Sequence, residues 1–142
     1  MRHSVYGKKL SRDKNQRTAL FKALVQSLLL SEKIQTTQAK AQAVKGLVDK
    51  IITQAKNPNT RRLVTQFLTN KKVSDKLFNE IVPSLQSRQS GYTSIVKLGF
   101  RKGDGAMIVQ MRLLLDEAKP EEPKTEKKTE KPKKVAKKKE TK

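Results

Sequence analysis

The 142-residue sequence contains no cysteine and no tryptophan, and His3 is its only histidine. The missing cysteine excludes disulfides and thiolate metal sites, and it fits a reducing compartment without proving one. No apolar run approaches the roughly eighteen residues of a transmembrane helix. The N-terminus also lacks the apolar segment of a signal peptide. Because only two tyrosines and four phenylalanines are present, the core has to be built from Leu, Ile and Val.

Acidic residues are scarce as well. The chain has 13 Asp and Glu against 33 Lys and Arg, which gives a formal net charge of +20. A charge this large opposes compaction by self-repulsion unless a partner neutralises it. The usual partners are nucleic acid and anionic membrane, and the sequence features below favour nucleic acid.

The sequence also lacks the residue patterns of an enzyme. No paired carboxylates occupy a patterned apolar pocket, and no nucleophile has a partner base at recognisable spacing. His3 lies in a basic terminal arm, where a histidine is more often solvated or in contact with RNA than catalytic. Residues 102–105 form a Gly/Asp turn without the GxxxxGK[ST] spacing of a phosphate loop. We therefore expect no enzymatic activity, no metal, no cofactor, no small-molecule substrate and no membrane partner.

Three segments differ in composition. Residues 1–12 form a basic arm without apolar periodicity, which gains order only on binding because burial cannot offset its chain entropy. Residues 13–118 contain the periodic apolar positions and are expected to fold as one domain. Residues 119–142 hold eleven Lys, five Glu and three Pro, a composition that predicts a disordered tail.

The first predicted helix covers residues 13–30, with Ser11 or Asp13 as its N-cap. Its apolar stripe consists of Leu20, Phe21, Leu24, Val25 and Leu28. Residues 33–37 are too few and too β-branched to continue the helix, so they predict a strand whose last residue, Thr37, caps the next helix.

Three more helices are predicted before the pattern changes. One covers residues 38–55 and is stopped by Asn57-Pro58, a second covers 61–68, and a third is capped by Ser74 and ended or kinked by Pro83. Their predicted core residues are Val44, Leu47, Val48, Ile51, Ile52 and Ala55, then Leu63, Val64, Phe67 and Leu68, then Leu77, Phe78, Ile81 and Val82.

From Gly91 onward the apolar period becomes two. Residues 92–100 and 106–115 flank the Gly/Asp-rich turn 101–105, which predicts a β-hairpin. One face of the second strand should cover the helices, and the other should be partly wet. The residues predicted to share the covered face are Met107, Val109, Met111, Leu113 and Leu115.

Positive charge gathers in the arm, at the start of the first helix and at the hairpin tip. Residues 1–31 hold seven Lys or Arg against one acid. A charge spread over several surfaces suits a protein embedded in folded RNA better than one recognition helix in a groove. Arg17 could either snorkel past the core edge or reach an anion beside the helix start. Tyr6 and Tyr92 could stack on bases, or they could be core-edge residues.

Two residue combinations are specific rather than generically basic. The first comprises Met1-Arg2-His3, Gly7, Lys9-Leu10, Arg12, Arg17-Thr18-Ala19, Leu28, Ile34, Thr36-Thr37 and Lys40-Ala41. The second comprises Gly91-Tyr92-Thr93, Lys97-Leu98, Arg101 and Gly103-Asp104. Together they resemble the bacterial large-subunit ribosomal protein L-seventeen family over residues 1–115.

The resemblance implies an α+β fold in the order α-β-α-α-α-β-β, with helices on a small mixed sheet, and the apolar periodicity predicts the same order. It also implies a cytoplasmic, ribosome-associated structural constituent of the large subunit that binds large-subunit rRNA beside other ribosomal proteins. The departures from the family pattern are Ser4, Gln16 and Gly46. Gly46 stands in mid-helix where a better helix former is usual, at a cost of about 1 kcal/mol relative to Ala.

The basic clusters and the resemblance together give the set of predicted RNA contacts. These are Arg2, His3, Lys8, Lys9, Arg12, Lys14, Arg17, Lys22, Lys40, Tyr92, Arg101 and Lys102.

Two other classes of protein were weighed. A DNA-binding or nucleoid-associated protein would need a dimer with one basic recognition helix, whereas the stripe at 44–55 has the pattern of a core. An RNA-modifying enzyme would need the missing catalytic residues.

Overall fold

The computed structural model describes residues 7–115. Arg2, His3 and Tyr6, which were weighed as RNA contacts, lie outside the described residues, and so does the predicted tail at 119–142. In chain order the elements are α1 (Lys14–Ser31), β1 (Lys33–Thr37), α2 (Gln38–Lys56), the short 3-10 helix η1 (Pro58–Thr60), α3 (Arg61–Phe67), α4 (Lys71–Lys76), the π-helical η2 (Leu77–Ile81), α5 (Val82–Ser84), β2 (Thr93–Phe100) and β3 (Met107–Leu113). Because α4, η2 and α5 follow one another without a break, the α+β order predicted from the sequence is confirmed.

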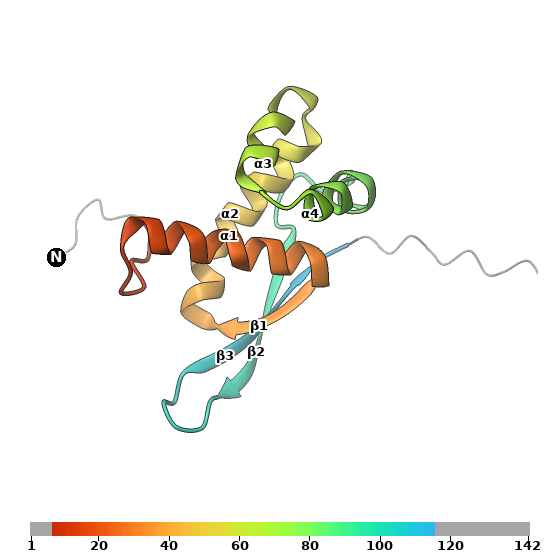
Figure 1. The fold of residues 1–142 in the computed structure, drawn as a ribbon. Coiled ribbons are helices and arrows are strands. Elements are labelled where there is room, and N and C mark those ends of the chain that lie inside the picture. Colours follow the sequence, from red (N-terminus) through yellow and green to blue (C-terminus); the bar gives the residue numbers. More distant parts are fainter. Residues whose placement is uncertain (1–6, 116–142) are drawn as a thin grey trace, which may run out of the picture.

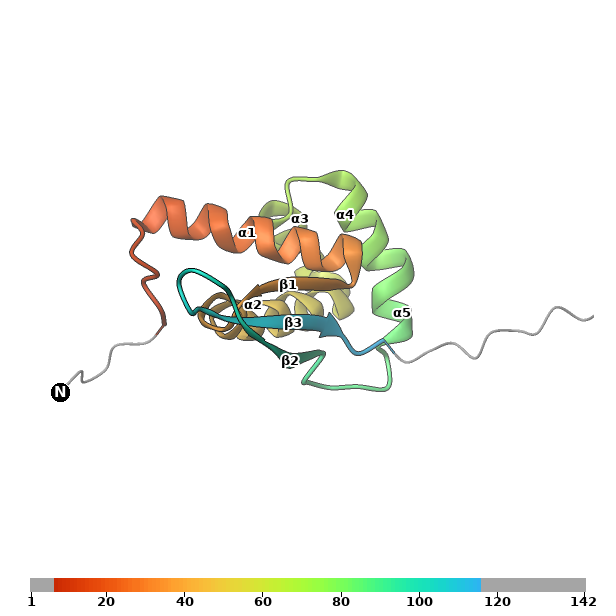
Figure 2. The ribbon, with the colours of Figure 1, turned by 90° about the horizontal axis from the view of Figure 1, so that it is seen from below.

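The three strands form one sheet in the order β1-β3-β2, and both strand pairs are antiparallel. The prediction of a mixed sheet was therefore wrong. β1 and β2 run in the same direction, but β3 lies between them and separates them. Figures 1 and 2 show α1 and α2 against the sheet, and they place the β2–β3 turn at the opposite end of the molecule from α4.

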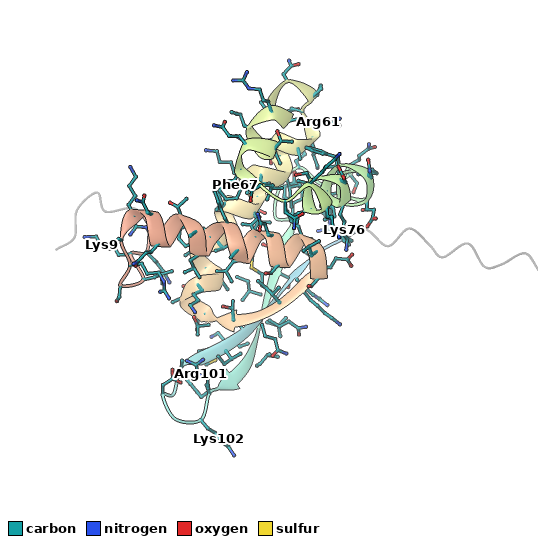
Figure 3. All side chains as sticks on the ribbon, in the orientation of Figure 1. Lys9, Arg61, Phe67, Lys76, Arg101 and Lys102 are labelled. Carbon is teal, nitrogen blue, oxygen red and sulfur yellow. The ribbon has the colours of Figure 1, made fainter. Side chains whose placement is uncertain are left out.

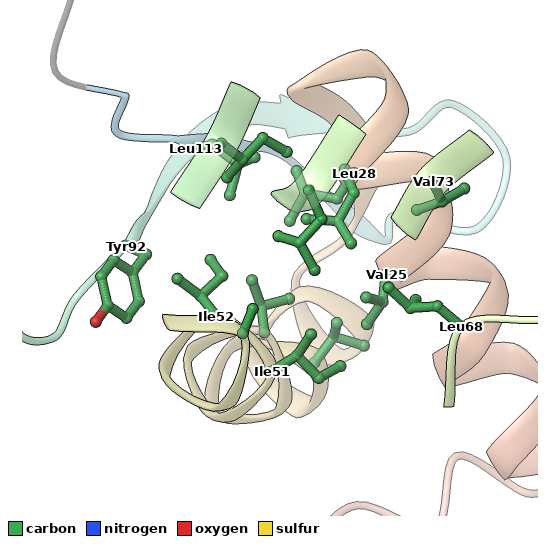
Figure 4. Close-up of a cluster of buried hydrophobic side chains, with 14 of the residues drawn as sticks. Val25, Leu28, Ile51, Ile52, Leu68, Val73, Tyr92 and Leu113 are labelled. Carbon is green, nitrogen blue, oxygen red and sulfur yellow. The ribbon is translucent and has the colours of Figure 1, made fainter. Parts of the chain in front are cut away.

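The core fills the space between the sheet and the helices (Figure 4). β3 alternates as predicted, because Val109, Met111 and Leu113 are buried while Arg112 is exposed. The predicted helical stripes supply most of the remaining core. The buried helical residues are Val25, Leu28 and Leu29 of α1, Ala41, Val44, Val48, Ile51, Ile52 and Ala55 of α2, and Val64, Val73, Leu77, Ile81 and Val82 of the later helices.

Two local predictions in the later helices were wrong. Ser74 does not cap a helix, because α4 already begins at Lys71 and the side chain of Asn70 accepts the N–H of Lys72 at 3.0 Å. Asn is among the preferred N-cap residues, so it sets the earlier start. Leu63 was expected in the core but is 46% exposed, because the seven-residue α3 turns Val64 inward instead.

The N-cap residues of α1 and α2 are among those predicted, but they lack the side-chain hydrogen bond of a cap. Asp13 and Thr37 are the N-cap residues of α1 and α2, but neither side chain makes a capping hydrogen bond. The proposed boundary between arm and domain at residue 12 stays a prediction.

Candidate nucleic-acid interface

The basic arm reverses direction just before α1. Leu10 and Ser11 have φ angles of 52° and 51°, in the left-handed region that non-glycine residues rarely adopt. The N–H of Arg12 donates to the carbonyl of Lys9 at 3.2 Å and closes the turn. The reversal carries the arm to α2, where the ammonium group of Lys8 donates to the side-chain oxygen of Gln42.

The reversed arm forms one wall of a groove of about 700 Å³ that reaches the hairpin, which we call the arm–hairpin groove. Its lining residues are Lys8, Arg12, Thr37, Gln38, Ala39, Lys40, Gln42, Arg101, Asp104, Ala106 and Met107. Four cations from three separate segments therefore meet at one surface. Figure 2 shows why they can meet, because the arm and the β2–β3 turn lie on the same side of the molecule.

On its other side the arm forms a cleft of about 560 Å³ with α1 and α2, which we call the arm–helix cleft. Its lining residues are Gly7, Lys8, Lys9, Arg17, Phe21, Gln42, Ala43, Gly46, Leu47 and Lys50. Lys8 and Gln42 line both hollows, so the two adjoin. No acidic residue is among the described residues that line the cleft.

The one acid in the groove, Asp104, forms a two-bonded ion pair with Arg101. The Nε and Nη2 atoms of Arg101 lie 3.0 and 2.5 Å from the two carboxylate oxygens. The hydrogen bond from Arg101, followed by that from the N–H of Ala106, lowers the pKa of Asp104 from 3.8 to about 2. Both side chains therefore stay charged at neutral pH, and the pair holds Arg101 at the mouth of the groove.

The structure brings together six of the predicted contact residues. Lys8, Lys9, Arg12, Arg17, Lys40 and Arg101 line one or both hollows. Arg17 also donates to the carbonyl of Arg12 at 3.2 Å, so it lies at the helix start and does not simply snorkel past the core. Figure 3 shows Lys9 beside the N-terminal end of α1 and Arg101 near the hairpin tip.

Three other predicted contacts lie outside both hollows. Lys14 opens α1, and Lys102 projects from the hairpin turn in Figure 3. The ammonium group of Lys22 lies 5.6 Å from the ring centroid of Phe67 on α3, a cation–π distance. Their contacts with RNA stay predictions, and each residue would contribute a positive charge separate from the two hollows.

Of the two alternatives for Tyr92, stacking on a base and a place at the edge of the core, burial contradicts the first, because the residue is 1% exposed. Its hydroxyl donates to the carbonyl of Gln89 at 2.8 Å, and the ammonium group of Lys56 lies 4.6 Å from its ring centroid. Gly91, with a φ of +69°, turns the chain just before it, and the N–H of Tyr92 donates to Asp49 at 3.2 Å. Tyr92 is thus a core residue that anchors the start of β2.

Sequence reasoning missed Lys50, Gly46 and Phe21 as lining residues of the cleft. Lys50 was not among the predicted contacts, and Phe21 was assigned to the core, where it is in fact only partly buried. One signal was present, because residues 43, 46, 47 and 50 of α2 follow i, i+3, i+4, i+7 and so share a second face of the helix.

Other kinds of site find no support between residues 7 and 115. No group of three or more His, Cys, Asp or Glu in this range could hold a metal ion. Within the same range, no helix has the length and apolar character that crossing a membrane requires.

The fold and the two hollows define a small, strongly basic α+β protein that presents cations from several segments at one surface. Residues 20–114 match the family model described as Ribosomal protein L17. The chain therefore belongs to the ribosomal protein L17 family, a family of ribosomal proteins and not of enzymes.

Relatives with this description cover most of the chain. The chain is 42% identical over 123 residues to the large ribosomal subunit protein bL17 of Thermodesulfovibrio yellowstonii, a match that spans 85% of the chain and 92% of the relative. It is 47% identical over 109 residues to the protein of the same name from Natranaerobius thermophilus, across 75% of the chain and 96% of the relative. With that of Carboxydothermus hydrogenoformans it shares 46% identity over 112 residues, across 78% of the chain and the whole of the relative.

Proposed function

We propose that this protein is a structural constituent of the large ribosomal subunit and that it binds large-subunit rRNA through the arm–hairpin groove and the arm–helix cleft. The observation that carries the proposal is the convergence of cations from the arm, α1, α2 and the hairpin. The seven cations that line the two hollows are Lys8, Lys9, Arg12, Arg17, Lys40, Lys50 and Arg101. The relatives above carry the large subunit in their names.

RNA suits this arrangement for a physical reason. Lys and Arg neutralise phosphates and release counterions, and such contacts fix the position of a protein without reading sequence. Side chains from distant segments that face adjoining hollows can engage backbones of different rRNA strands at their crossing. The protein would thereby hold rRNA segments that repel one another.

Neighbouring large-subunit ribosomal proteins are proposed as further partners. β2 is an edge strand, and Val96, Leu98 and Phe100 on it are 45%, 50% and 74% exposed. Apolar side chains gathered on one exposed strand are typical of a surface that a protein partner covers.

A DNA-binding or nucleoid-associated protein is the second candidate. It would need a dimer seam and a projecting recognition helix. The most regular apolar stripe, on α2, is buried in the core and is not available as a seam. A stable dimer in light scattering, together with a preference for duplex DNA, would favour this candidate.

The test is incorporation into ribosomes. A tagged Arg12→Glu/Lys40→Glu variant, expressed beside the wild-type protein, should be depleted from large subunits after a high-salt wash, as measured by quantitative mass spectrometry. The matched control, Lys71→Glu/Lys72→Glu, reverses the same number of charges on α4, away from both hollows. Equal stoichiometry of the groove variant and the control would contradict the proposal.

A further inference from the structure

We propose that the arm–helix cleft binds a single unpaired nucleotide of the RNA, with its base against Phe21 and its phosphates on the surrounding cations. The inference rests on the proposed function and goes beyond it, because it distinguishes a base-binding pocket from a surface that only neutralises backbone charge. Four features of the cleft carry it: its size, its apolar floor, its glycine and its charge.

The size is that of a small-ligand site. The cleft measures about 560 Å³, within the range of roughly 300 to 1,000 Å³ found for pockets that enclose small molecules. Three segments wall it: the arm at Gly7, α1 at Arg17, and α2 at Gln42. A hollow lined by three separate segments has room for one nucleotide.

The floor is apolar and contains an aromatic ring. Phe21 and Leu47 are partly buried and pack against the core on one side while lining the cleft on the other. Core packing therefore fixes the phenyl ring in place. Every base presents a flat face, and stacking on an aromatic side chain strengthens binding by about tenfold or more per base.

Gly46 opens the cleft. Glycine is unfavourable in mid-helix, and neither the backbone conformation nor close packing explains it here, because a Cβ built at this position meets nothing within 4 Å. Gly46 lies between Ala43 and Lys50 on the wall that α2 contributes. Any larger side chain would project into the cleft, so the glycine keeps room for a ligand.

The rim selects an anion. Lys8, Lys9, Arg17 and Lys50 surround the floor, and no acid opposes them among the lining residues described. The amide of Gln42, which now accepts from Lys8, can bond to the edge of a base. A flat apolar floor beneath a cationic rim fits a nucleotide, whose ring is apolar on its faces and whose phosphates carry the charge.

The experiment uses the full-length chain, transcribed large-subunit rRNA and the variant Gly46→Leu. Leu fills the cleft and is a better helix former than Gly, so the variant should melt at or above the wild-type temperature. Base-specific chemical probing should show an unpaired nucleotide whose reactivity changes with wild-type protein and returns to that of free RNA with the variant. Affinity should fall about tenfold, while the hydroxyl-radical footprint on the backbone persists.

The matched control is Thr53→Leu, which adds a leucine at an exposed α2 position outside both hollows. It should reproduce the wild-type pattern. A second variant, Phe21→Leu, keeps apolar bulk but removes the ring, and it should lose the base-specific change while retaining the backbone footprint.

The two proposals fail in different ways. If Gly46→Leu protects and alters the same nucleotides as wild type with unchanged affinity, the cleft binds no base, and rRNA binding through the cations still stands. The same result would follow if a protein segment occupied the cleft. If wild-type protein leaves no footprint on the rRNA at all, the proposed function falls together with this inference.

Discussion

The dependence of RNA binding on salt concentration can be predicted from the cations that line the two hollows. Seven Lys and Arg residues line them, and one of these, Arg101, is partly neutralised by Asp104. Each phosphate that a cation neutralises releases counterions, so the logarithm of the binding constant falls by about 0.9 per contact for each logarithmic unit of salt. With up to seven contacts the slope should approach about −6.

This slope sets the size of the effect. Raising salt from 50 to 200 mM is a fourfold change, and a slope near −6 makes RNA binding about 4,000-fold weaker. The double variant Arg12→Gln/Lys40→Gln removes two contacts and should reduce the slope by about 2. The loss over the same salt range then becomes about 250-fold. Arg12 is exposed, and Lys40 is only partly buried and outside the core, so the fold should be unaffected.

The assay is fluorescence anisotropy with a labelled rRNA fragment at a series of NaCl concentrations. The matched control, Lys71→Gln/Lys72→Gln, removes two charges from α4, outside both hollows, and should keep the wild-type slope. A slope near −1 for the wild type, or equal slopes for the groove variant and the control, would refute the assignment of these cations to phosphates.

Three further outcomes are expected. Tyr92→Phe should lower the free energy of unfolding by about 0.5–1.5 kcal/mol, because it removes the hydrogen bond to the Gln89 carbonyl. The variant should bind RNA with unchanged affinity. Weaker RNA binding by a fully folded variant would contradict the buried position of Tyr92. In a carbon-detected NMR titration the carboxyl of Asp104 should titrate near pH 2. The folded pKa of Asp104 lies below its ordinary value of 3.8, so the ion pair with Arg101 stabilises the fold fully above pH 3.8. This stability is lost as the pH falls from 3.8 toward 2. A midpoint near 3.8 would mean that the ion pair does not persist. Raising NaCl from 0.1 to 1 M shortens the Debye length from about 10 to about 3 Å. The melting temperature of the RNA-free protein should therefore rise, because repulsion between its cations is screened. A fall in melting temperature would show that this repulsion does not limit stability.

The fold could be predicted largely from local patterns. The stripe of α2 and the alternation along β3 are periodic, and one buried face is enough to produce each pattern. The errors arose where tertiary competition decides. Asn70 and Ser74 are both acceptable N-caps, and in the fold Asn70 caps α4 while Ser74 lies buried within the helix. Leu63 and Val64 are adjacent apolar residues, and the position of α3 decides which of them is buried.

The site could be predicted only in part, because composition identifies cations but not their convergence. Arg12, Lys40 and Arg101 are distant in sequence, and their shared groove depends on the reversal of the arm and the direction of the hairpin. Tyr92 shows the opposite failure, because a tyrosine beside Gly91 in a basic protein looks available for stacking until its burial is known.

The reversal of the arm connects chain conformation to binding. Two consecutive left-handed residues, Leu10 and Ser11, cost about 1–2 kcal/mol each. The bonds that oppose this cost, from Arg12 to Lys9 and from Lys8 to Gln42, lie at the surface and contribute about 0.5–1.5 kcal/mol each. The cost of about 2–4 kcal/mol and the gain of about 1–3 kcal/mol nearly cancel, so the reversed arm is not strongly favoured in the free protein. A phosphate held by both the arm and α2 adds favourable energy to the reversed form alone. RNA binding and ordering of the arm should therefore be a single coupled equilibrium.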